Sequence, residues 1–242
     1  LPMNRNLWLL ALCQGLFLTN NVVFIAINGL VGLQLAPYGW MATLPVMGYV
    51  VGGALSTPLV AQTQRRWGRQ VSFQIGLVVA LLSALLCAWA AFQGNFWLLC
   101  LATLVAGYYS ANGQLYRFAA AELTSAAHRE KAVSLVLAGG LLGAVAGPNL
   151  ASQARDLFSV PFAGAYLALV VVALLSMACM AAIRFEALPA STTGSAGQGR
   201  SLAELMREPV FLVAVLGAAL GYGVMNLLMA ATPLAMQVCG YA

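Results

Sequence analysis

The chain has 242 residues, of which 62% are hydrophobic and 7% are charged, and its net charge is +5. A soluble domain carries roughly 25% charged residues, so this composition excludes an ordinary soluble globular protein. The apolar residues form long runs, whereas a membrane β-barrel needs alternating segments of about 10 residues. The sequence therefore predicts a polytopic α-helical membrane protein.

Seven apolar runs are long enough to cross a bilayer, because a membrane helix needs about 20 apolar residues. In chain order, the predicted spans cover residues 7–33, 39–61, 71–92, 96–121, 132–151, 161–183 and 210–236. A Gly/Ser/Thr/Ala-rich linker follows the sixth span, and Ser201 with Glu204 forms a capping-box pattern that predicts a short helix. The predicted organisation is a six-helix domain (1–184), a cytoplasmic linker (185–208) and a seventh helix (209–242).

Basic residues are distributed unevenly between the two sides of this topology. Ten of the 11, all but Arg155, fall on the side that holds the N-terminus. Cytoplasmic segments of membrane proteins carry an excess of Lys and Arg. We therefore expect a cytoplasmic N-terminus, in a bacterial inner (plasma) membrane.

The second and fifth spans resemble each other. Five residues in the second span and the loop after it recur at an offset of 90 (143 − 53): Gly53, Ala54, Pro58, Ala61 and Arg65 match Gly143, Ala144, Pro148, Ala151 and Arg155. Because the two spans run in opposite directions, the repeat is inverted in the membrane. Inverted three-helix repeats are a building plan of secondary transporters; coincidence in a chain rich in Gly and Ala is the alternative.

The loop after the second span points to a family. Arg66, Gly68 and Arg69 match the Gly-x-x-x-Asp-Arg-x-Gly-Arg-Arg loop of major facilitator superfamily transporters. Three positions depart from that pattern, at Ala61, Arg65 and Gln70. The chain resembles the N-terminal six helices of such a transporter followed by the seventh helix. This resemblance implies an all-α membrane bundle, with a six-helix domain of two inverted three-helix repeats and the first helix of an incomplete second domain.

Further motifs extend the resemblance to gating residues. Gly143, Gly147 and Pro148 are similar to a Gly-x-x-x-Gly-Pro motif associated with exporters that work as antiporters, although plain helix packing also explains them. Glu122 looks like the acidic end of the family's fourth helix. The resemblance implies gating roles for Arg66, Gly68, Arg69, Glu122, Gly143, Gly147 and Pro148. We predict that Arg69 pairs with Glu122 when the cytoplasmic side is closed.

Polar residues deep in three spans predict a substrate site. Asn21, Asn112 and Asn226 lie in the first, fourth and seventh spans, and these helices line the central cavity in the resembled family. Polar groups in hydrocarbon are costly and face a cavity or another helix. Tyr109 and Tyr222 are the predicted aromatic walls. Hydrogen bonding between helices is the competing explanation.

Arg117 lies about one turn inside the inner end of the fourth span. It either snorkels to the headgroups or attracts anions to the inner mouth of the cavity. The sequence contains no catalytic motif, metal-ligand pattern or cofactor motif, so an enzyme, a cofactor and a nucleic-acid partner are not expected.

The predicted function is a secondary active transporter that moves a small organic solute by alternating access, with export as one possible direction. The alternative is a seven-helix receptor or a non-transport membrane scaffold. The expected partners are a small-molecule substrate and the lipid bilayer. No Asp or Glu lies deep in a span, so a coupling ion is left open.

Overall fold

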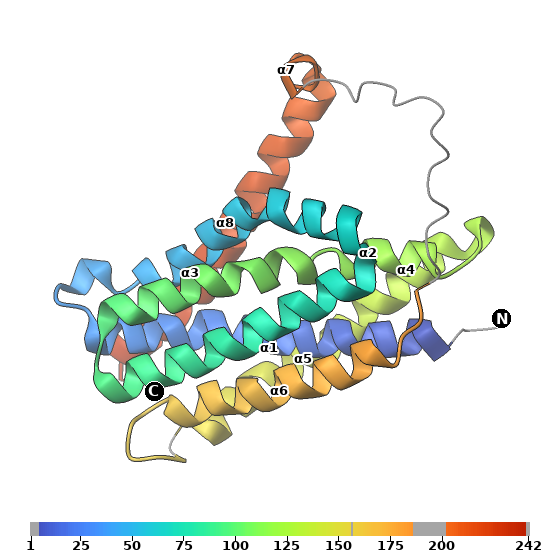
Figure 1. The fold of residues 1–242 in the computed structure, drawn as a ribbon. Helices are drawn as coiled ribbons and strands as arrows, with labels where there is room; N and C mark the ends of the chain where they lie inside the picture. Colours follow the sequence, from blue (N-terminus) through green and yellow to red (C-terminus); the bar gives the residue numbers. More distant parts are fainter. Residues whose placement is uncertain (1–4, 156, 186–201, 241–242) are drawn as a thin grey trace. The chain divides into compact units, whose positions relative to one another are not determined.

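The computed structural model describes residues 5–155, 157–185 and 202–240 (Figure 1). The chain divides into two compact units, residues 1–185 and 186–242. The first contains α1 (Arg5–Leu35), α2 (Leu44–Gln93), α3 (Phe96–Gly113), α4 (Tyr116–Glu122), α5 (Arg129–Ala154) and α6 (Ala163–Ala181), with 3-10 turns at Gly39–Met41 and Ala126–His128. The second contains α7 (Leu202–Leu205) and α8 (Pro209–Val238). Every regular element in these ranges is a helix, as the sequence predicts.

Helix α2 contains both the second and the third predicted spans. Its 50 residues would extend about 75 Å at 1.5 Å per residue, more than twice the about 30 Å of a hydrocarbon core. The helix bends at Gly68, whose φ of 81° and ψ of 171° are not helical, and the chain runs back across the bundle (Figure 1). The first arm (44–67) and second arm (69–93) of α2 are therefore separate crossings.

The fourth predicted span is broken where a continuous helix was expected. Helix α3 ends at Gly113, and α4 begins at Tyr116. A Cβ atom on Gly113 would lie 2.2 Å from the Phe17 ring, so the ring of α1 packs directly against the α3 backbone. Asn and Gly are weak helix formers, and the Asn112–Gly113 pair ends α3 at this contact.

Five helical stretches in the described ranges are long and apolar enough to cross a membrane. One of them, Gly39–Gln93, contains both arms of α2. The protein is therefore a multi-pass membrane protein.

Glycines bring two helix pairs into close contact. A Cβ atom on Gly143 of α5 would lie 2.2 Å from the Gly15 carbonyl oxygen of α1. A Cβ atom on Gly107 of α3 would lie 2.3 Å from the Gly52 carbonyl carbon and the Gly53 nitrogen of α2. Gly53 and Gly143 are the matched positions of the predicted repeat. Gly53 of α2 faces Gly107 of α3, and Gly143 of α5 faces Gly15 of α1. Both crossings are close glycine contacts, and the inverted repeat itself stays a prediction.

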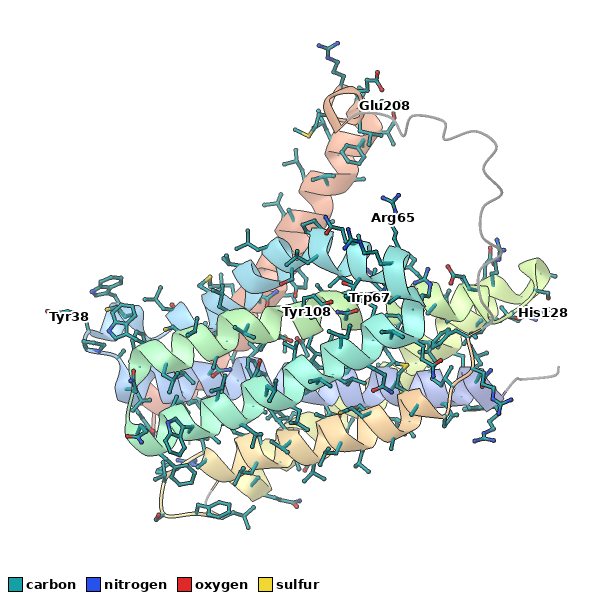
Figure 2. The ribbon with its side chains drawn as sticks, viewed as in Figure 1. Tyr38, Arg65, Trp67, Tyr108, His128 and Glu208 are labelled. Carbon is teal, nitrogen blue, oxygen red and sulfur yellow. The ribbon has the colours of Figure 1, made fainter. Side chains whose placement is uncertain are left out.

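Several contacts gather at one end of the first unit. The Asn6 amide donates to the Arg184 carbonyl at 3.0 Å, and the Gln70 amide donates to the Ile183 carbonyl at 3.0 Å. These bonds bring the start of α1, the bend of α2 and the end of α6 together. We call this end of the first unit the basic end, because Arg65, Arg66 and Arg69 lie at or beside the bend of α2. Tyr38 lies at the opposite end (Figure 2).

Candidate functional site

An ion pair joins the bend of α2 to the end of α4. The Arg69 guanidinium donates to the Glu122 carboxylate, and their side chains are 18% and 35% exposed. The structure thus contains the predicted pair, whereas its role in gating stays a prediction. Partial burial reduces the screening of the two charges by water, so this pair contributes more than a fully exposed one.

Gly68 directs Arg69 toward α4. Its φ and ψ fall in a region that is essentially restricted to glycine, and the resulting bend reverses the chain immediately before Arg69. Arg66, one residue before Trp67 on the first arm, is exposed. The pair with Glu122 is made by Arg69, so the two arginines of the loop motif have different surroundings.

The glycine motif of α5 packs against α1. A Cβ atom on Gly147 would lie 3.1 Å from the Val22 Cβ, which is tighter than most packing contacts. Gly143 makes the still closer approach to Gly15, and Pro148 lies in the same helix with an exposed side chain. The structure therefore assigns Gly143 and Gly147 to helix packing, and any part in the direction of transport stays a prediction.

Asn21 is buried between helices. The Tyr49 hydroxyl of α2 donates to the Asn21 Oδ1 atom at 2.9 Å, and Tyr49 packs against Phe24 with ring centroids 4.9 Å apart. Asn28, one heptad later, accepts a hydrogen bond of 2.6 Å from the Tyr166 hydroxyl of α6. Both amides of α1 thus bond tyrosines of neighbouring helices.

Asn112 has a similar environment at the end of α3. The Ser72 hydroxyl of α2 donates to its Oδ1 atom at 3.0 Å, and its own amide donates to the Tyr108 carbonyl at 3.2 Å. Its side chain is fully buried. The structure does not bring Asn112 into direct contact with Asn21; each amide connects a different pair of helices.

Tyr109 belongs to an aromatic cluster. Its ring meets Phe17 edge-to-face with centroids 5.4 Å apart, and Phe17 also contacts Tyr116, which packs against Phe73. Edge-to-face pairs of this kind are favourable. Tyr109 is thus held by α1 and its neighbours, and its ring is 2% exposed.

The remaining predicted site residues lie elsewhere. Arg117 is exposed, with its guanidinium 5.1 Å from the centre of the Phe118 ring, and both explanations of this residue stay predictions. Asn226 donates to the Tyr222 carbonyl at 2.9 Å within α8. Asn226 and Tyr222 belong to the second unit. Their predicted convergence with Asn21 and Asn112 therefore stays a prediction.

The sequence reasoning missed the partners of the buried amides. Tyr49, Ser72 and Tyr166 are single polar residues inside apolar runs, and that placement was the available signal. Gln14 recurs with Asn21 and Asn28 every seven residues on one face of the first span, and its Oε1 atom is buried without a hydrogen-bond partner. Among the residues that the structure describes, no group of three or more His, Cys, Asp or Glu side chains could hold a metal ion.

The sequence profile of the Major Facilitator Superfamily matches residues 7–242. The chain belongs to this superfamily.

Three curated relatives are similar to it. The riboflavin transporter RfnT of Brucella anthropi is 32% identical over 98% of this chain and 60% of its own length. Two uncharacterized MFS-type transporters of Bacillus subtilis are also similar: YdeG is 28% identical over 54% of this chain and 31% of its own, and YddS is 29% identical over 50% and 28%. The chain thus spans about 60% of the length of RfnT and less of the other two.

Proposed function

We propose that this protein is a secondary active transporter that moves a flavin-like small organic solute across the membrane by alternating access. The observation that carries this proposal is the similarity to a riboflavin transporter over 98% of the chain, within a superfamily profile that matches residues 7–242. Transport, as opposed to catalysis or signalling, is the activity named for all three relatives.

The side chains of the predicted site suit such a solute. Riboflavin joins a planar heteroaromatic ring, which has polar edges, to a neutral polyol chain. An amide side chain offers both a donor and an acceptor, so Asn21, Asn112 and Asn226 can bind neutral polar groups without burying a charge. Tyr109 and Tyr222 offer rings for stacking. Because Asn21 and Asn112 already bond Tyr49 and Ser72, substrate binding would exchange those bonds for bonds to the solute.

The ion pair at the basic end supplies a gate in this proposal. Arg69 and Glu122 hold the bend of α2 against α4, which favours one access state over the other. A ligand or contact shifts a two-state equilibrium only by its differential interaction with the two states. We place the basic end and the N-terminus in the cytoplasm, at the inner membrane of a bacterium, because basic segments of inner-membrane proteins stay there.

Direct transport tests the proposal. The full-length protein is produced in a riboflavin-auxotrophic bacterium that lacks its own flavin importer, and uptake of radiolabelled riboflavin is compared with the empty vector. Preloaded cells or vesicles measure efflux in parallel. Uptake or efflux that unlabelled riboflavin inhibits, and ribitol does not, supports the proposal. Absence of both, with the protein present in the membrane, would contradict a flavin substrate.

A further inference from the structure

A surface groove lies beside the bend of α2. It has a volume of about 370 Å³ and is formed by the two arms of α2 together with α3, all within the first unit. Leu59 of the first arm and Ile75 and Val79 of the second arm supply apolar walls. The groove is distinct from the buried amides of the proposed substrate site.

Two hydroxyl groups lie at the floor of this groove. The Thr63 Oγ1 and Tyr108 hydroxyl oxygens are 2.9 Å apart and share a hydrogen bond. Thr63 also donates to the Leu59 carbonyl of its own helix. The two hydroxyl groups therefore satisfy each other, so an apolar chain can lie over them without leaving either hydroxyl unpaired, and Gln62, the exposed amide of the lining, can stay in contact with water.

The rim of the groove is cationic and aromatic. Arg66 and Trp67 line it, and Trp67 is 59% exposed although its ring is large and apolar. Among the described residues of the first unit, the ion pair at this bend is the one between Arg69 and Glu122, and Arg66 does not take part in it. Arg66 and Leu59 are seven residues apart, so the rim and the apolar wall are separated by about 10 Å along the helix.

We propose that this groove binds one anionic phospholipid, whose phosphate contacts Arg66 and Trp67 and whose acyl chain lies along Leu59, Ile75 and Val79. Trp is enriched at the depth of lipid headgroups and Arg in the cytoplasmic segments beside them, and basic pockets between membrane helices bind anionic headgroups. Charge and polarity thus change along the groove in the order in which they change along a lipid.

A second groove provides an internal comparison. It lies along the second arm and reaches Ala181 of α6, has a volume of about 490 Å³, and shares Ile75 and Val79 with the first groove. The Gln70 and Gln74 amides at this groove donate to the Ile183 and Met177 carbonyls, each at 3.0 Å. No basic residue lines it. This groove can contact acyl chains but has no group that selects a phosphate.

Two adjacent arginines allow a matched test. Arg65 is exposed and does not line the groove, and Figure 2 shows its side chain pointing away from the bundle. Native mass spectrometry of the full-length protein measures binding of dioleoylphosphatidylglycerol and dioleoylphosphatidylcholine to Arg66→Ala and Arg65→Ala variants. We expect Arg66→Ala to lower the preference for phosphatidylglycerol about fivefold, the factor that one basic residue contributes at an anionic surface. Arg65→Ala should leave it unchanged. Equal losses in both variants, or no loss in either, would overturn the proposal.

A second test measures the fluorescence of Trp67 in protein that keeps Arg66. Its result does not depend on whether the Arg66→Ala variant folds. The full-length protein is placed in vesicles that contain brominated phosphatidylglycerol, and a Trp67→Phe variant identifies the signal of Trp67. Brominated phosphatidylglycerol should quench Trp67 more strongly than brominated phosphatidylcholine does. Equal quenching by both lipids, or protection of Trp67 from both, refutes the lipid site. Quenching by riboflavin that displaces the lipid assigns the groove to the substrate and also refutes it.

Discussion

Replacing Gly143 by Ala tests the close crossing of α1 and α5. The new Cβ atom would lie 2.2 Å from the Gly15 carbonyl oxygen and 2.7 Å from the Thr19 nitrogen. Ordinary contact begins at 3.4 Å, so the two backbones must separate by about 1.2 Å (3.4 − 2.2). Both neighbours are backbone atoms of a helix and cannot rotate away. Overpacking of this kind costs about 1–3 kcal/mol, which corresponds to a fall of roughly 2–12 °C in Tm for a protein of this size.

The predicted inverted repeat makes this prediction sharper. Gly107→Ala would place a Cβ atom 2.3 Å from the backbone of Gly52 and Gly53, so it should cost a similar amount at the equivalent crossing of α3 and α2. Gly39→Ala is the control, since nothing lies within 4 Å of its added Cβ atom. Thermal unfolding of the three purified variants is the measurement. If Gly143→Ala and Gly107→Ala melt at the temperature of Gly39→Ala, the two crossings are looser than the structure shows and the packing argument fails.

Three further changes probe the gate, the bend and a buried amide. Glu122→Gln removes the charge that Arg69 binds. It should change the free-energy difference between the access states by about 0.5–1 kcal/mol, which is a two- to fivefold change in their ratio. Unchanged transport and unchanged labelling of cysteine probes in the inner cavity would exclude a gating role. Gly68→Ala forces alanine into a glycine-only conformation and should destabilise the protein by about 1–3 kcal/mol, so an unchanged Tm would show that the bend tolerates a side chain. Asn112→Ala leaves the Ser72 hydroxyl without its acceptor and should lower the free energy of unfolding by about 1–3 kcal/mol; an unchanged Tm with weakened riboflavin binding would instead place Asn112 at the substrate.

The sequence by itself determined the helical bundle and its crossings. Apolar runs of about 20 residues leave a chain no other way to satisfy its backbone hydrogen bonds in lipid, and the structure places helices in all seven. The sequence also predicted a loop between the second and third spans, where the structure has the bend at Gly68, and it predicted the pairing of Arg69 with Glu122. These features are local, or depend on residue types whose backbone or charge allows few alternatives.

Only the tertiary structure decided how the polar residues are used. From the sequence, Asn21 and Asn112 could face a cavity or a neighbouring helix, because the spacing along a helix fixes a face but does not identify what lies opposite it. The structure supplies Tyr49 and Ser72 as their partners. It likewise breaks the fourth span at Gly113, where the Phe17 ring occupies the position that a side chain would need. These outcomes depend on residues distant in sequence, which are brought together when the helices pack.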